Sequence, residues 1–215
     1  MHLAGMNRYQ AFGIHFGISL MIFIGLVTMV LFVWYPGVLR EVDSSWQQAL
    51  IMIAGVDLVL GPLLTLIVFN PAKKSLKMDL SIIAIAQIAA LIAGTYTVHQ
   101  ARPVALYVSF PAEGFEILTA NNLAPKTESY LIENGSLFFY YTGKELFGPS
   151  NQKDLQPDQL IPTSEGDFNS YLSTKMPQSL FLFEKTLSID IPAANAKAIF
   201  DLEGNYKRLE DQTSQ

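Results

Sequence analysis

QQALIMIAGVDLVLGPLLTLIVF, residues 47–69, is the stretch that decides the fold of this chain. An α-helix rises about 1.5 Å per residue, so a helix of this length crosses the roughly 30 Å hydrocarbon core of a bilayer. The stretch carries one carboxylate, Asp57, near its middle. A charge at that depth costs on the order of 2.5–3.5 kcal/mol. A polar partner must offset this cost, and the identity of that partner is the main functional question.

One face of this helix is small and polar. Side chains three or four positions apart are neighbours on a helix, which places four residues together: Ala54, Asp57, Gly61 and Thr65. Small residues allow another helix to approach, and Asp and Thr offer hydrogen bonds to it. Pro62 cannot donate to the carbonyl of Leu58, so we expect a kink beside the carboxylate. Two interpretations stay open: helices of this chain cover the face, or a helix of another protein binds it.

A first apolar helix is predicted over about 14–35, and its aromatic end is typical of a membrane interface. It is longer than the core of a signal peptide and no cleavage pattern follows, so we expect a retained anchor. Gly13 and Gly17 form a GxxxG pattern, which is either a packing notch or chance. His15 is interpreted as an interfacial side chain, not a ligand.

A third apolar helix is predicted over about 80–99, with Asp79 as its N-cap. Ala86, Ala90 and Gly94 recur every four residues and would form a small-residue stripe against the second helix. Four basic residues lie on the side of the N-terminus and the second loop: Arg8, Lys73, Lys74 and Lys77. Only Arg40 and Arg102 lie near the membrane on the other side. The positive-inside rule therefore predicts that residues 1–13 are cytoplasmic and that 100–215 lie across the membrane.

Residues 100–215 differ in composition from the first half, with nine Lys and Arg against fifteen Asp and Glu. This acidic balance disfavours nucleic acid as a partner. Short alternating patches predict strands at 104–110, 115–119, 136–142 and 180–186, the last two as central strands, and helices at 167–175 and 193–200. The tail after Leu209 is expected to fray. The predicted fold class is a membrane protein with three transmembrane α-helices followed by a small α+β extracytoplasmic domain.

The sequence offers little for catalysis. It has no cysteine, and its three histidines, His2, His15 and His99, all precede the second half. A Ser-His-Asp arrangement is therefore not available there, and phosphate-binding and HExxH motifs are absent. We expect no enzyme, no catalytic residue, no cofactor and no metal. Asp57, with no basic residue at its depth, is either protonated and hydrogen-bonded or paired with a group from a partner.

Four stretches resemble the type IV pilin accessory proteins of the TfpX/TfpZ family: RYQAFGIHFGIS (8–19), LFVWYPG (31–37), AGVDLVLGPLLTLIVFNPAKKSLKMDLSIIAIAQ (54–87) and HQARPVAL (99–106). The likeness covers about the first half of the chain and is specific around Asp57, Gly61, Pro62, Asn70, Pro71 and Asp79. It implies a multi-pass protein of the bacterial inner membrane with a periplasmic domain. It also implies a chaperone-like role in pilin stability, pilus assembly or pilus dynamics.

The resemblance implies the membrane-embedded major pilin as partner, with the lipid bilayer and other pilus assembly proteins as further contacts. Our hypothesis is that the face of Asp57, Gly61 and Thr65, together with Gly13 and Gly17, contacts the pilin helix, with Asp57 protonated and hydrogen-bonded. The outer domain would contact the pilin head. Two alternatives stay open: a small membrane sensor with a ligand-binding periplasmic domain, and a membrane enzyme that modifies pilin or lipid.

Overall fold

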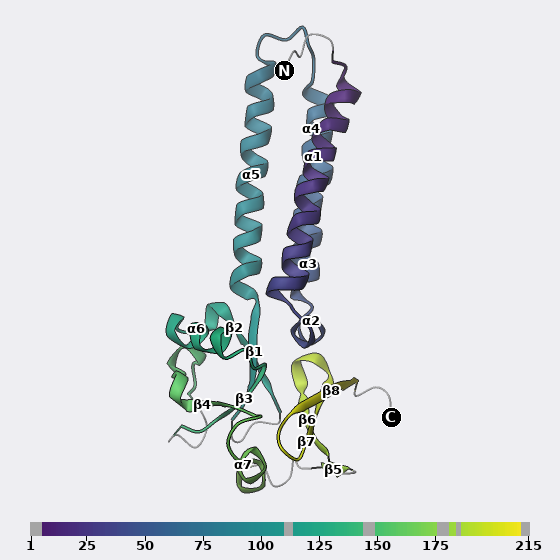
Figure 1. The fold of residues 1–215 in the computed structure, drawn as a ribbon. Coiled ribbons are helices and arrows are strands. Elements are labelled where there is room, and N and C mark those ends of the chain that lie inside the picture. The colour runs from purple at the N-terminus through teal and green to yellow at the C-terminus, as the bar shows by residue number, and fades with distance from the viewer. Residues whose placement is uncertain (1–5, 110–113, 144–148, 176–180, 184–185, 212–215) are drawn as a thin grey trace. The chain divides into compact units, whose positions relative to one another are not determined.

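The computed structural model describes residues 6–109, 114–143, 149–175, 181–183 and 186–211. The chain forms two compact units (Figure 1). The helical unit comprises the residues up to Trp34 together with Ser44–His99. The strand unit comprises Tyr35–Asp43 and the residues from Gln100 onward. A short segment between the first two long helices therefore belongs to the second unit.

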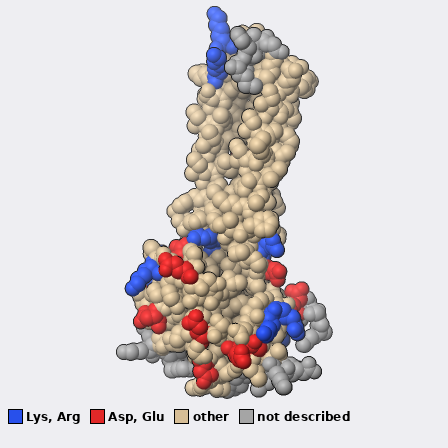
Figure 2. All heavy atoms as spheres, viewed as in Figure 1, with Lys and Arg blue, Asp and Glu red and all other residues tan. Residues whose placement is uncertain are grey.

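Among the described residues, the helical unit contains three helices that are long and apolar enough to cross a membrane, as predicted. The first is α1 (Arg8–Met29), extended by a π-helical turn at Val30–Trp34. The second is α3 (Ser45–Ala54), a π-helical turn at Gly55–Leu60 and α4 (Gly61–Val68). The third is α5 (Leu76–Ala101). On the face shown in Figure 2, the surface of these helices is uncharged between their ends. Such a surface suits lipid, since charged side chains are expensive in a bilayer.

Local capping explains where the first helix begins, six residues before the predicted start. The side chain of Asn7 accepts from the backbone N–H of Gln10 at 2.9 Å. The side chain of Gln10 in turn accepts from the backbone N–H of Asn7, also at 2.9 Å. This reciprocal pair satisfies two backbone donors that the first turn of a helix leaves free. The first helical turns therefore include residues that the sequence assigned to a polar N-terminal segment.

The prediction that Asp79 caps the third helix was wrong. The helix already begins at Leu76, so Asp79 lies in its first turn. Its Oδ2 is 2.5 Å from Nζ of Lys73 and also accepts from the hydroxyl of Ser75. An acidic side chain in the first turn is favourable because the helix dipole is positive there. The lysine in the preceding loop adds a second reason for its position.

The described residues of the strand unit form two four-stranded sheets. The first has the order β2-β1-β3-β4, in which β1 is parallel to β3 and the other pairs are antiparallel: β1 (Pro103–Val108), β2 (Glu116–Thr119), β3 (Phe138–Tyr141) and β4 (Leu160–Pro162). The second is an antiparallel meander: β5 (Phe181–Phe183), β6 (Thr186–Ile191), β7 (Ala196–Asp201) and β8 (Tyr206–Asp211). Three helices accompany the sheets: α2 (Val38–Val42), α6 (Pro125–Asn134) and α7 (Phe168–Lys175).

Both faces of the first sheet are buried. One face shares an aromatic core with β6, β7, α7 and α2, to which Phe138, Phe200 and Leu39 contribute. The opposite face packs against α6 through Tyr107, Phe139 and Leu131. Side chains of a strand alternate between the two faces of its sheet, so β3, with all four residues buried, serves both cores. The strand unit thus has a helix layer, a central sheet and a second sheet.

Three predictions in this unit were wrong. Residues 193–200 were predicted as a helix but form a 3-10 turn (Pro192–Ala194) and then β7. Asn195 adopts a left-handed backbone with φ 51°, which stops the helical turn after Ala194. The segment 180–186 was predicted as a central strand, but β5 is an edge strand, and the neighbouring residues 180, 184 and 185 lie outside the described residues. The tail was expected to fray after Leu209, yet β8 continues to Asp211.

Candidate functional site: a cleft among three apolar helices

The second long helix changes its hydrogen-bonding pattern at Asp57. The backbone N–H of Gly61 donates to the carbonyl of Val56, five residues earlier, instead of to that of Asp57. The next residue, Pro62, has no N–H to donate. The carbonyl of Asp57 therefore has no helical donor from either residue. The sequence predicted a freed carbonyl at Leu58 and a kink; the structure adds a π-helical turn before the proline and a freed carbonyl at Asp57. The kink stays a prediction.

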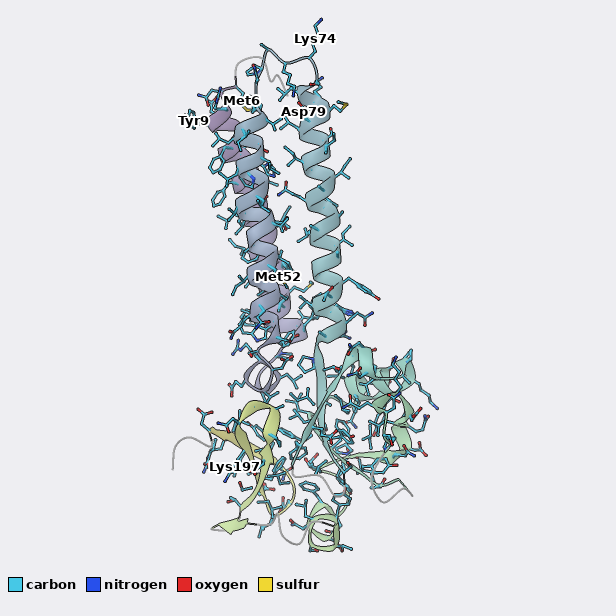
Figure 3. The ribbon with its side chains drawn as sticks, turned by 180° about the vertical axis from the view of Figure 1, so that it is seen from behind. Met6, Tyr9, Met52, Lys74, Asp79 and Lys197 are labelled. Atoms are coloured by element: carbon cyan, nitrogen blue, oxygen red, sulfur yellow. The ribbon has the colours of Figure 1, made fainter. Side chains whose placement is uncertain are left out.

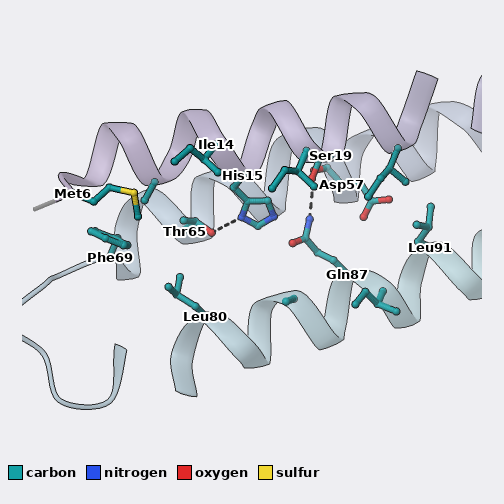
Figure 4. A pocket seen from close by; sticks show the side chains of 15 residues that line it. Met6, Ile14, His15, Ser19, Asp57, Thr65, Phe69, Leu80, Gln87 and Leu91 are labelled. Atoms are coloured by element: carbon teal, nitrogen blue, oxygen red, sulfur yellow. Dashed lines mark hydrogen bonds between the residues drawn. The ribbon is translucent and has the colours of Figure 1, made fainter. Parts of the chain in front are cut away.

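Gln87 of α5 supplies the missing donor. Its Nε2 donates to the carbonyl oxygen of Asp57 at 3.4 Å (Figure 4). The amide reaches this carbonyl over Gly61, where a Cβ atom would overlap the Gln87 side chain. Gly61 is therefore needed for close approach, and its neighbour in the structure is a helix of this same chain. At this point the structure favours the interpretation in which the chain covers its own polar face.

A second polar contact joins α1 to α4. Nδ1 of His15 lies 2.6 Å from Oγ1 of Thr65. The Thr65 residue is buried, with 3% of its surface exposed. His15 is also close enough to interact electrostatically with Asp57. The prediction that His15 is only an interfacial side chain was therefore wrong. It faces the interior of the helical unit because Ala11, His15 and Ser19, spaced by four residues, share one face of α1.

These residues surround a cleft of about 390 Å³ among the three helices (Figure 4). Its walls are mainly apolar, with polar groups from His15, Ser19, Asp57, Thr65 and Gln87. Asp57 is 7% exposed, and its Oδ1 atom has no hydrogen-bond partner among the described residues. Burying an unsatisfied polar atom is costly, and more so in an apolar unit. The cleft therefore contains an acceptor that none of the described residues satisfies.

The predicted site residues divide into three groups. Asp57 and Thr65 line the cleft, and Gly61 and Pro62 are buried beside it. Ala54 is half-buried on the same helix but does not line the cleft. Gly13 and Gly17 are exposed, and a Cβ atom on either would meet nothing within 4 Å. Each lies two residues from His15, roughly 200° around the helix, so one partner helix cannot contact both these glycines and Asp57.

The sequence interpretation missed His15, Ser19 and Gln87 as members of the site. A signal was present for each of them. Gln87 is the one amide within the apolar run from Leu80 to Gly94, and His15 and Ser19 are four positions apart in the middle of α1. A polar side chain in a membrane-type helix faces the protein interior by default. Within the described residues, no group of three His, Asp or Glu side chains could hold a metal ion.

Three apolar helices, a mainly apolar cleft with a few polar groups between them and a separate strand unit are compatible with a multi-pass membrane protein carrying an extramembrane domain. The chain is 37% identical over 113 residues to the fimbrial assembly protein of serogroups C1 and C2 of Dichelobacter nodosus, a match that covers 52% of this chain and 84% of that relative. The chain therefore belongs to the family of these fimbrial assembly proteins.

The relatives from serogroups E1 and I of the same organism show the same identity over 113 residues. The match covers 43% of each, so the chain spans less than half the length of these two relatives. No protein-family model matches the chain, and no solved structure matches it.

Proposed function

We propose that this chain is an inner-membrane accessory protein that binds the type IV major pilin and supports pilin stability, pilus assembly or pilus dynamics. The observation that carries the proposal is the match to relatives named for fimbrial assembly, which reaches 84% of one of them. Those names support a role in pilus assembly, and the resemblance of residues 54–87 to pilin accessory proteins refines it to pilin binding.

Membrane insertion is the first part of the proposal. The hydrophobic side chains of the three long helices are largely exposed, with 11–28% of each membrane-length stretch buried inside the chain. Exposed apolar residues on this scale need a lipid or protein partner. Met6, Tyr9, Lys74 and Asp79 lie at one end of the helical unit (Figure 3). The basic residues near that end favour a cytoplasmic location for it, with the strand unit in the periplasm.

Binding, not catalysis, is the second part. The polar groups of the cleft are suited to hydrogen bonding between helices inside a membrane. A pilin held by an apolar helix would present such a helix to the helical unit, and the strand unit would be available to the pilin head. The chain is thus proposed to act without a cofactor and without chemical change to the pilin.

The test is to tag the chain at its C-terminus, extract it in mild detergent and ask whether the major pilin of the same organism co-purifies. We expect the pilin in the eluate and fewer surface pili in a deletion strain. A topology reporter fused after residue 109 should be active in the periplasm. Normal piliation in the deletion strain together with no retained pilin would contradict the proposal.

A further inference from the structure

We propose that the cleft between α1 and α5 binds an apolar transmembrane helix of the partner, and that a neutral hydrogen-bond donor on this helix meets Oδ1 of Asp57. The inference rests on the proposed function, because it assumes a membrane-embedded partner. It adds the place of binding, the side of the helical unit that is used and the chemistry of the recognised group.

The unmatched acceptor is the first argument. The other polar contacts of the cleft are made within the chain, between His15 and Thr65 and between Gln87 and the Asp57 carbonyl. Within the part of the chain that the structure describes, Oδ1 of Asp57 has no partner, although the residue is more than nine-tenths buried. A protonated carboxyl group donates through one oxygen and still accepts at the other. Oδ1 itself is covered, but the terminal torsion of an Asp side chain is soft, so a rotation of the carboxyl group lets a hydroxyl or amide donor in the cleft satisfy it.

Water alone does not match the lining of the cleft. Its walls are mainly apolar, and ordered water is held where polar groups bind it. A lipid chain fits the apolar walls but brings no donor to Asp57. An apolar helix with one Ser, Thr, Asn or Gln side chain matches both features.

The cleft opens between α1 and α5. The lining residues that are also exposed come from these two helices: Ile14, Ile18, Ile22, Ala84 and Ile88. Asp57 and Thr65 lie deeper, on the second long helix. The side of α4 around Gly61 is occupied by Gln87. A partner helix therefore approaches across the isoleucines of α1 and α5, and not along the Gly61 face that the sequence suggested.

The experiment uses the full chain in membranes of cells that also make the organism's major pilin. A photo-reactive benzophenone residue replaces Ile18 or Ile88 at the mouth of the cleft, or, as matched controls, Ile24 or Ile82, which are exposed but do not line it. Crosslinked products are identified by mass. We expect pilin adducts from positions 18 and 88 and little from 24 and 82.

Two variants test the chemistry at Asp57. Asp57→Asn keeps a neutral acceptor of the same shape and should retain the pilin adducts. Asp57→Leu removes the acceptor and should lower their yield about three- to tenfold, as expected for one hydrogen bond between membrane helices. If Asp57→Asn loses the adducts as fully as Asp57→Leu, the ligand is recognised by charge, and the proposal of a neutral donor is wrong.

The outcomes separate this inference from the proposed function. Pilin adducts that form equally from positions 24 and 82 would overturn the cleft as the binding site and leave pilin binding intact. Adducts of phospholipid alone at positions 18 and 88 would show that lipid fills the cleft. No pilin adduct at any position, together with no pilin in the detergent eluate, would overturn both.

Discussion

Oγ1 of Thr65 and Nδ1 of His15 lie 2.6 Å apart, and this hydrogen bond joins α4 to α1 across 50 residues of sequence. Whichever group donates, the pair satisfies two polar atoms that would otherwise be buried in an apolar unit. Hydrophobic burial does not drive helices together inside lipid, so polar contacts and packing must do so. The pair therefore fixes the rotation of α1 and brings His15 into the cleft.

Removing either partner should weaken the helical unit. We expect Thr65→Val and His15→Leu each to be destabilising, with a coupling energy of about 0.6–1.7 kcal/mol in the double-mutant cycle. The free energy of unfolding is measured by SDS titration in mild-detergent micelles. Thr28→Val serves as control, since the hydroxyl of the exposed Thr28 bonds only within its own helix, to the carbonyl of Ile24. Additive effects at positions 15 and 65 would contradict the coupling.

The three helices could be predicted because their evidence is local: length, hydropathy and the lone carboxylate are all visible in sequence. The partners of that carboxylate could not be predicted, because they depend on how the helices are rotated relative to each other. The GxxxG spacing of Gly13 and Gly17 was considered as a packing notch, whereas it is His15 between them that lines the cleft. Two residues along a helix reverse the direction of a side chain. The polar spacing of α1 therefore carried more information than its glycines.

The strand unit shows the same limit. Strands rich in aromatic residues, such as β3, could be predicted because aromatic residues favour strands. In the structure, all four residues of β3 are buried. The helix predicted over 193–200 failed because good helix formers there, among them Ala196 and Ala198, fill buried positions of β7. Tertiary packing overrides intrinsic propensity at such positions.

Two ion pairs in the strand unit should differ in strength. Arg102 and Glu128 are 2.5 Å apart with side chains 12% and 24% exposed, whereas Arg208 and Glu210 are 2.6 Å apart at 64% and 44%. We expect Glu128→Gln to cost about 1.5–3 kcal/mol and Glu210→Gln less than about 1 kcal/mol. Thermal unfolding in detergent, followed by circular dichroism, measures both. Equal losses would show that burial does not strengthen the first pair.

Asp201 should give the strand unit a pH dependence at low pH. Lys207, whose Nζ lies 2.8 Å from Oδ2, and donors from Asn205 and Glu203 hold the pKa of Asp201 well below its usual range. Because the folded pKa lies below the unfolded value of about 3.9, the stabilisation is complete above that value. It is lost as the pH falls through the folded pKa.

Asp201→Asn should therefore lower the melting temperature at pH 7, by an amount that corresponds to less than about 1 kcal/mol for such an exposed pair. The difference between the two proteins should narrow once the pH falls below about 4. Melting curves from pH 7 down to the lowest pH at which the detergent-bound chain stays folded give the comparison. A gap that is constant with pH would show that the charge of Asp201 contributes nothing.

Gly61→Ala tests whether the close approach of α5 matters, and here two effects oppose each other. Alanine in a helix interior is favoured over glycine by about 0.8–1 kcal/mol, whereas overpacking against the Gln87 amide costs about 1–3 kcal/mol. We expect a net loss of stability in the SDS titration, while Gly25→Ala, whose new Cβ meets nothing within 4 Å, should be neutral or stabilising.

The double variant Gly61→Ala/Gln87→Ala removes the clash but also the donor to the Asp57 carbonyl. It should therefore be less stable than wild type yet lose less than the sum of the two single changes, and a fully additive loss would mean that Gln87 does not rest on Gly61.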